Sequence, residues 1–159
     1  MKLRVSLPEQ TLEVLADDGR VARVYPVSTA ANGAGEERNS FCTPRGRHIV
    51  RAKIGAGLPL NSVFVARRPT GEIYSPELGA TLPERDWILT RILWLSGKEP
   101  GYNRLGSCDS MRRYIYIHGT PDETFEQVPR SHGCIRMRNR DLAEVFDQVP
   151  VHTAVQFIA

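Results

Sequence analysis

The segment 131–138, SHGCIRMR, places a cysteine directly after a histidine and a glycine and shortly before two arginines. A cysteine attacks a carbonyl carbon as its thiolate, and a neighbouring histidine can take the thiol proton. His118 lies upstream of Cys134, separated by a loop over residues 119–131 that is long enough to fold back and bring the two side chains together. These residue types predict acyl transfer, with Cys134 as the nucleophile and His118 as the general base.

The arginines that follow Cys134 bear on the ionisation of its thiol. If residues 134–138 are extended, the two-residue period of a strand places Cys134, Arg136 and Arg138 on one face. Positive charge on that face stabilises a thiolate, so we expect a lowered pKa for Cys134. This group of arginines could bind an anionic small substrate. Alternatively, Arg136 and Arg138 are ordinary charged residues of the surface.

His118 is expected to end a strand over residues 112–119, RRYIYIHG, at the rim of a sheet. Alternation puts Tyr116 on the same face as His118. The carbonyl of Gly119 can fold back to hold one ring nitrogen, which leaves the other free to act as a base. His132 is the second candidate for the base, with an orienting role as its alternative.

Gly133 is expected to form a tight turn before the nucleophile. The backbone N–H groups of Gly133 and Cys134 would then point at the oxygen of a tetrahedral intermediate, and a side chain at position 133 would block that approach.

A zinc site is the rival chemistry, because His118, His132 and Cys134 are all metal-ligand types. The sequence offers no fourth cysteine or carboxylate at ligand spacing, and Arg136 would repel a cation. We therefore expect neither a metal nor another cofactor. A binding protein without catalysis is the remaining alternative.

Four other residues of reactive type are expected to be structural. Cys42 and Cys108 are expected to be buried small hydrophobes, and His48 and His152 to have structural roles.

The elements that must position these residues are mostly strands. Short runs of alternating apolar and polar residues fill the first half of the chain, with a tight Asp-Gly turn in the sequence DDGR. The segment 87–97 is short enough for a helix, but its alternation favours a central strand. The expected strands cover residues 3–7, 11–16, 21–29, 43–55, 61–68, 87–97, 112–119 and 153–159.

Residues 69–86 contain three prolines and two glycines and are expected to form a long surface excursion. Only residues 139–150 read as a helix, with Asn139 as the N-cap, apolar residues at helical spacing, and Pro150 as the stop. The pattern predicts an all-β sandwich or barrel-like pair of sheets with one helix appended.

Composition limits the class of protein. The 159 residues suit one domain, 1–159, and the net charge of +3 lacks the continuous basic stripe of a nucleic-acid binder. Three cysteines are not a disulfide framework and fit a reducing compartment. The N-terminal segment has no secretory pattern and no apolar run would span a membrane, so we expect a cytoplasmic protein without a membrane partner.

The segment 117–139, IHGTPDETFEQVPRSHGCIRMRN, resembles the signature of L,D-transpeptidases with the YkuD-type catalytic domain. The resemblance extends to TPRG at residues 43–46 and covers the whole chain, most weakly over residues 60–112. It implies a mostly β fold: a β-sandwich of mixed sheets with one short helix after the catalytic motif. It also implies a cleft under a flap, which we expect within residues 66–86.

The resemblance also implies site roles. Cys134 would be the nucleophile, His118 the base and Gly119 the carbonyl that orients it. His132 and Gly133 would help to form the oxyanion pocket. The residues expected to bind substrate are Arg136, which would hold a carboxylate, with Ser131 and Tyr116.

Substrates of the family are peptidoglycan stem tetrapeptides, which lose a terminal D-alanine to an amine or to water, and carbapenem β-lactams would acylate the same cysteine. We expect water as the acceptor, which makes the chain an L,D-carboxypeptidase acting on recycled muropeptides in the cytoplasm. A cross-linking transpeptidase, exported as a longer precursor, is the alternative.

Overall fold

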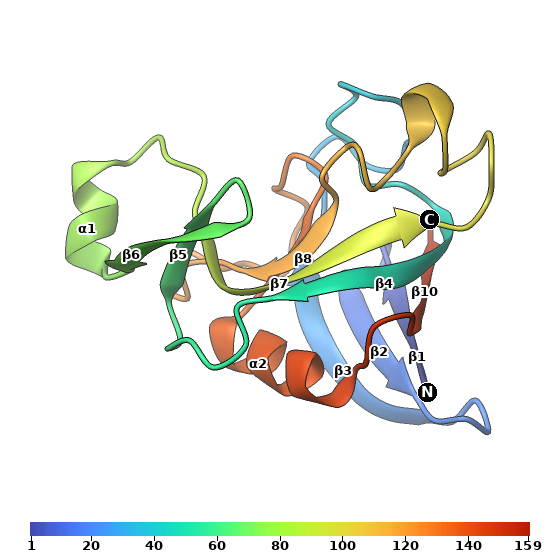
Figure 1. Cartoon of the computed structure of the whole chain (residues 1–159), viewed down its shortest axis with the longest axis horizontal. Helices are drawn as coiled ribbons and strands as arrows, with labels where there is room; N and C mark the ends of the chain where they lie inside the picture. Colours follow the sequence, from blue (N-terminus) through green and yellow to red (C-terminus); the bar gives the residue numbers. More distant parts are fainter.

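The computed structural model describes all residues from 1 to 159 and is dominated by ten strands (Figure 1). The strands are β1 (Lys2–Ser6), β2 (Thr11–Leu15), β3 (Val21–Ser28), β4 (Gly46–Ile54), β5 (Ser62–Val65), β6 (Arg68–Ile73), β7 (Ile88–Gly97), β8 (Tyr116–Gly119), β9 (Ile135–Met137) and β10 (Ala154–Ile158). The helices are α1 (Pro76–Thr81), a short 3-10 turn η1 (Gly106–Cys108) and α2 (Asn139–Gln148).

The strands form one mixed sheet that folds back on itself. Its order is β4-β10-β1-β2-β3-β9-β8-β7-β5-β6, and β4 also pairs with β7, which joins the two faces of the sandwich. The β1–β10 and β8–β9 pairs are parallel, whereas the other pairs are antiparallel. The mostly β, mixed-sheet fold expected from the sequence is confirmed. The β5–β6 hairpin extends from β7 beyond the closed part of the sheet.

The core lies between the faces of the folded sheet, where every second residue of a strand points inward. Leu3 and Val5 of β1 are fully buried there, as are Ile117 of β8 and Ile135 of β9. These residues belong to one apolar cluster of 19 buried side chains. The parallel pair β8–β9 therefore has a firm inner face, and its outer face is free to carry polar groups.

Helix α2 covers one side of this core, below β7 in Figure 1. Its apolar residues recur at helical spacing and are buried in the core cluster. On its outer side, Glu144 accepts hydrogen bonds from Tyr25 (2.9 Å) and Arg23 (3.2 Å) of β3. The helix that follows the cysteine motif is thereby fixed to both faces of the sandwich.

Two details of secondary structure differ from the sequence prediction, and one ambiguous segment is settled. The strand expected from residue 112 begins only at Tyr116, because Tyr114 has a φ of 58° and ends the alternation. The excursion over residues 69–86 contains most of β6 and the helix α1, which begins at Pro76 and is capped by the Ser75 hydroxyl. The segment over residues 88–97 is a strand, as the alternation favoured.

The N-cap of α2 is also corrected. Arg138 holds the N-cap position without a side-chain hydrogen bond, and Asn139 is the first residue of the helix. Asn139 is only 1% exposed, and its side chain bonds to neighbouring segments instead of capping the helix. None of the helices is long and apolar enough to cross a membrane.

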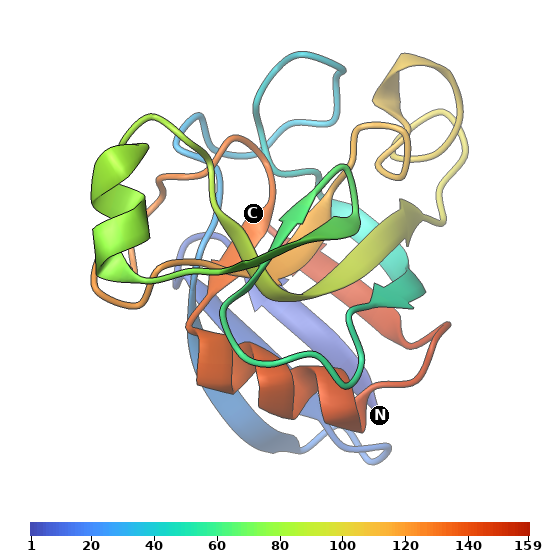
Figure 2. The same cartoon turned by 60° about the vertical axis from the view of Figure 1, so that its left-hand side comes forward.

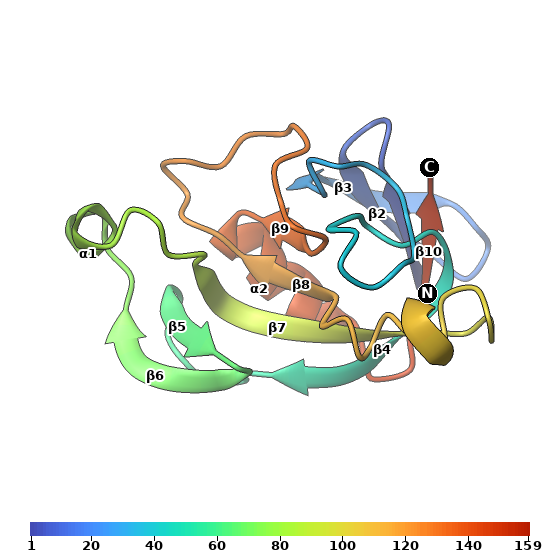
Figure 3. The ribbon, with the colours of Figure 1, turned by 90° about the horizontal axis from the view of Figure 1, so that it is seen from above.

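The β5–β6 hairpin and α1 project together from the end of β7, away from both chain termini (Figures 1 and 2). They form the flap, which we define as residues 62–86. Tyr74 of the flap donates a hydrogen bond to Glu123 in the loop between β8 and β9. Figure 3 shows that loop running from the sheet toward α1 and back. Residues of the flap and of this loop line a common cleft.

Candidate active site

Cys134 lies immediately before β9, with its side chain half-buried against a small apolar cluster of Phe64, Ile92 and Tyr116. Its thiol donates a hydrogen bond to the carbonyl of Tyr114 at 3.3 Å, and its sulfur accepts one from the Tyr116 N–H at 3.3 Å. Two backbone groups on the neighbouring segment thus fix the position of the sulfur.

His118 and Cys134 share the outer face of the β8–β9 pair. The parallel register pairs Ile117 with Ile135, both facing the core, and His118 with Arg136, both facing outward. Cys134 lies two residues before Arg136, so the strand period returns its side chain to the face of His118. The register places the thiol and the imidazole as diagonal neighbours on adjacent strands, the arrangement expected for a nucleophile and its base.

The imidazole of His118 is held in one orientation. Its Nδ1 lies 2.6 Å from the carbonyl oxygen of Gly119, the carbonyl expected to orient it. Because a carbonyl only accepts, Nδ1 carries the proton and Nε2 is the nitrogen free to accept one. Burial lowers the pKa of His118, opposed by the nearby Asp86 carboxylate and the Gly119 carbonyl. A neutral ring with a free Nε2 is the form that a general base requires.

The ionisation of Cys134 differs from the sequence expectation. The pKa of Cys134 is raised to about 12, mainly by burial and to a smaller extent by the Asp86 carboxylate. The Tyr116 N–H, Arg136 and Arg113 lower it, but by less. Positive charge is present as expected, yet desolvation outweighs it, so the resting group is a thiol. A nucleophilic role for Cys134 would therefore require the proton to leave as the sulfur attacks.

The turn before Cys134 is held from two sides. The Ser131 hydroxyl donates to the Cys134 carbonyl at 2.5 Å and accepts from the Gly133 N–H at 3.2 Å. The buried Thr43 hydroxyl donates to the Gly133 carbonyl at 2.9 Å and accepts from the Ala30 N–H at 3.0 Å. Gly133 has a φ of 128°, which disfavours any side chain. These bonds fix the backbone that carries the candidate nucleophile.

This geometry revises two expectations. Ser131 is 2% exposed and its hydroxyl is used within the turn, so it positions the cysteine and does not face a substrate. The Gly133 N–H is likewise occupied by Ser131. Of the two donors expected at the oxyanion, the Cys134 N–H is the one that makes no hydrogen bond.

Arg136 faces the flap. Its guanidinium forms an ion pair of 3.1 Å with Asp86, and both residues line a cleft of about 440 Å³ between the flap and the β8–β9 loop. Arg138 is exposed and lies over the ring of Phe125 at 4.9 Å, outside this cleft. Of the two arginines, Arg136 is the one beside the candidate nucleophile.

Tyr116, expected to bind substrate, is 4% exposed. Its hydroxyl accepts a hydrogen bond from Arg67, at the tip of the β5–β6 hairpin, at 3.0 Å. Its backbone N–H reaches the sulfur of Cys134. Tyr116 therefore connects the hairpin to the candidate nucleophile, and its hydrogen bond to the sulfur comes from its backbone.

His132 points to the other side of Cys134. It is exposed and meets Phe41 edge to face, with ring centroids 5.8 Å apart. In this position, His132 makes no hydrogen bond to the imidazole of His118 or to the thiol of Cys134. The structure contains no cluster of three or more residues with metal-ligating side chains that could hold a metal ion, so His118, His132 and Cys134 are not arranged as ligands.

A buried polar network behind His118 was not expected from the sequence. The Asn139 side chain donates to the Thr120 carbonyl at 2.8 Å and accepts from the Thr90 hydroxyl. A Cβ on Gly119 would lie 2.2 Å from the Asn139 side-chain oxygen and 2.6 Å from the Leu89 carbonyl. Asn139 was visible as a motif residue, but only its partners show that it braces the backbone carrying the carbonyl that orients His118.

The remaining cysteines and histidines have mixed outcomes. Cys108 is buried as expected, whereas Cys42 is only half-buried. His48 is fully buried and bonds to the Ser110 hydroxyl at 2.7 Å, which confirms its structural role. His152 is exposed in a turn with a φ of 76°, so its side chain has no packing role.

Comparison with known proteins agrees with this fold and motif. The L,D-transpeptidase catalytic domain family (YkuD) matches residues 2–157, and the chain belongs to this family of enzymes. The probable L,D-transpeptidases YbiS of Escherichia coli K12 and ErfK/SrfK of Salmonella typhimurium LT2 are similar over 46 residues, each with 48% identity. That segment is 29% of this chain and 15% of either relative.

Solved structures show the same fold. An L,D-transpeptidase from Xylanimonas cellulosilytica aligns with a TM-score of 0.56 at 19% identity, covering 98% of this chain and 59% of that one. An L,D-transpeptidase from Mycobacterium smegmatis aligns with a TM-score of 0.55 at 21% identity, covering 99% of this chain and 58% of that one. A third structure is L,D-transpeptidase 3 from Mycobacterium tuberculosis in complex with a faropenem-derived adduct. It aligns with a TM-score of 0.56 at 18% identity, covering 99% of this chain and 59% of that one. The chain thus spans about three fifths of these relatives.

Proposed function

We propose that this chain catalyses cysteine-dependent acyl transfer on peptidoglycan stem tetrapeptides, cleaving the bond between the third residue and the terminal D-alanine. The observation that carries the proposal is the shared outer face of His118 and Cys134, with Nδ1 of His118 held by the Gly119 carbonyl. Membership of the L,D-transpeptidase family supplies the substrate class.

In the acylation step, Sγ of Cys134 attacks the carbonyl carbon of the third residue as its proton passes to Nε2 of His118. The Cys134 N–H, which has no partner in the structure, is placed to donate to the developing oxyanion. Collapse of the intermediate breaks the peptide bond, and the proton on Nε2 leaves with the amine of D-alanine. The product is a thioester between Cys134 and the shortened peptide.

Arg136 is the residue that we assign to a substrate carboxylate, and it already holds the Asp86 carboxylate in the cleft. A guanidinium that pairs with one carboxylate is suited to another of the same geometry. His132, Gly133, Ser131 and Tyr116 then act by shaping and positioning the site.

Water is the acceptor that we favour for the thioester, which makes the chain an L,D-carboxypeptidase. Hydrolysis requires no second peptide-binding surface. The three free cysteines fit a reducing compartment, so we further propose that the substrates are free muropeptides recycled in the cytoplasm.

A transpeptidase that uses an amine acceptor is the second candidate, favoured by the names of the matched relatives.

The test is incubation of the protein with the free tetrapeptide, with and without a D-amino acid as acceptor, followed by mass spectrometry. We expect loss of D-alanine in both samples and only a minor exchange product. Exchange that outruns hydrolysis would favour the transpeptidase, and an unchanged peptide in both samples would contradict the proposed function.

A further inference from the structure

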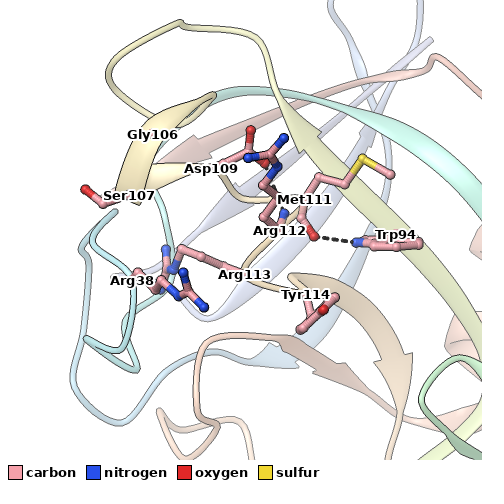
Figure 4. Close-up of a pocket in the computed structure, with 9 residues that line it drawn as sticks. All are labelled: Arg38, Trp94, Gly106, Ser107, Asp109, Met111, Arg112, Arg113 and Tyr114. Atoms are coloured by element: carbon pink, nitrogen blue, oxygen red, sulfur yellow. Dashed lines mark hydrogen bonds between the residues drawn. The ribbon is translucent and has the colours of Figure 1, made fainter.

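A second cavity, of about 460 Å³, lies beside η1 and is rich in arginine. Figure 4 shows Arg38 and Arg113 close together, Arg112 beside Asp109, and the aromatic rings of Trp94 and Tyr114 on another wall. We call this cavity the arginine pocket. The family motif does not include its lining residues, and the mechanism above does not use them.

The charge in the arginine pocket is unbalanced. Arg38 and Arg112 are exposed, and neither guanidinium forms an ion pair or a hydrogen bond with another part of the chain. Asp109 is the one acidic residue of the lining. Its carboxylate accepts hydrogen bonds from the backbone N–H groups of Leu105 (2.7 Å) and Arg112 (3.0 Å), not from the Arg112 guanidinium. Two guanidinium groups therefore remain available to an anion.

Arg113 holds one wall of the arginine pocket in place through hydrogen bonds. It donates to the carbonyls of Cys42 at 2.7 Å and Gly35 at 3.3 Å, so it fixes the loop that carries Arg38. Burial lowers the pKa of Arg113, which indicates a guanidinium partly withdrawn from water. A partly desolvated positive charge attracts an anion more strongly than an exposed one.

The aromatic wall is also fixed. The indole N–H of Trp94 donates to the Met111 carbonyl at 3.0 Å. The guanidinium of Arg67 lies 4.9 Å from the centre of the Trp94 ring and 4.7 Å from that of Tyr114. The pocket thus pairs an ordered apolar surface with positive charge, as suits a peptide that bears a carboxylate.

The arginine pocket shares one residue, Tyr114, with the surroundings of the candidate nucleophile. Tyr114, whose side chain lines the pocket, accepts the thiol hydrogen bond of Cys134 on its carbonyl. An adjoining cavity of about 210 Å³ shares the three arginines and Tyr114 and adds Phe41 and His132. His132, two residues before Cys134, and Tyr114, whose carbonyl accepts the thiol hydrogen bond, therefore place both cavities next to the candidate nucleophile.

We propose that the arginine pocket binds a carboxylate of the part of the peptide that stays on Cys134 after D-alanine leaves. This inference rests on the proposed function, since it names how the same substrate is recognised. With Arg136 on one side of the thiol and the arginine pocket on the other, the enzyme selects peptides with free carboxylates on both sides of the scissile bond. Guanidinium groups recognise carboxylates through paired charge-assisted hydrogen bonds.

The test compares the tetrapeptide with a form whose carboxylates outside D-alanine are converted to carboxamides. Loss of charge-assisted bonds is expected to raise KM of the wild type for the amidated peptide about tenfold, with little change in kcat. The double variant Arg38→Ala/Arg112→Ala should raise KM for the free peptide by a similar factor and no longer distinguish the two. Arg51→Ala/Arg140→Ala removes two exposed charges elsewhere and should behave as wild type.

Binding to protein carrying Cys134→Ala, measured by calorimetry, separates this inference from the proposed function. A weaker affinity for the amidated peptide, abolished by the double variant, supports the arginine pocket even if the wild type cleaves nothing. Equal affinity for the two peptides, or a double variant that binds like the control pair, overturns the inference even if cleavage is normal.

Discussion

The Asp86 carboxylate of the flap lies 3.1 Å from the Arg136 guanidinium on β9, two residues after the candidate nucleophile. The flap carboxylate thus forms an ion pair with the same arginine that we propose binds a carboxylate of the substrate. Asp86 also raises the pKa of His118 and of Cys134. One flap residue therefore pairs with the arginine that we assign to the substrate and shifts the pKa of both candidate reacting groups.

Asp86→Asn is expected to shift the pH dependence of kcat/KM. The base acts only when neutral, so the acid limb follows the pKa of His118. Because Asp86 raises that pKa, its neutralisation should move the acid limb to lower pH. KM should fall as Arg136 becomes available. Glu84→Gln, an exposed acid of the same loop, is the control. An acid limb that stays in place or moves to higher pH would contradict this role.

The thiol of Cys134 is expected to stay protonated at neutral pH. Burial raises its pKa to about 12, above the ordinary cysteine value of about 8.5. The difference in thiolate ultraviolet absorbance between wild type and Cys134→Ser should therefore be absent at neutral pH and appear only in strong alkali. A thiolate step below about pH 8.5 would instead indicate a preformed ion pair with His118.

Gly119→Ala is expected to disrupt the bracing of His118. Its Cβ would collide with the Asn139 side chain and the Leu89 carbonyl, so we expect a loss of about 2–3 kcal/mol in the free energy of unfolding. The rate should fall at least tenfold, since the displaced carbonyl is the one that holds His118. Gly57→Ala meets no atom within 4 Å and should cost only the strain of its φ of 80°, about 1 kcal/mol. Equal losses by denaturant titration would refute the packing explanation.

Thr43→Val tests the support of the nucleophile turn. The near-isosteric change removes the hydroxyl that bonds to Gly133 and Ala30, leaving a buried N–H and a carbonyl unpaired, at a cost of about 2–3 kcal/mol. We expect kcat to fall while KM changes little, because Thr43 acts through the backbone of Gly133. Thr11→Val, which removes a hydroxyl without a hydrogen bond, is the control. A variant with wild-type kcat would show that the turn holds without Thr43.

The sequence alone was enough to predict the periodic strands and helix of the fold and to recognise the motif. Alternation in β1 and β7 and the helical spacing of α2 are local patterns, so they predict elements directly. The left-handed backbone at Tyr114 is not a local signal, because nothing in its own residue type requires it. The short helix α1 was hidden by the prolines and glycines around it.

Charge placement was harder to predict from the sequence than the fold. The arginines near Cys134 were visible, but the desolvation that outweighs them depends on apolar side chains from distant strands. The Asp86–Arg136 pair joins residues 50 positions apart, which no periodicity specifies. The arginine pocket likewise joins separate loops.

The most direct test of the account is the intact mass of the protein after exposure to a carbapenem or to the tetrapeptide, followed by peptide mapping. We expect one covalent acyl adduct per chain, located on Cys134 and absent from Cys134→Ser. An adduct that maps to Cys42 or Cys108, or that persists in Cys134→Ser, would contradict the assignment of Cys134 as the nucleophile.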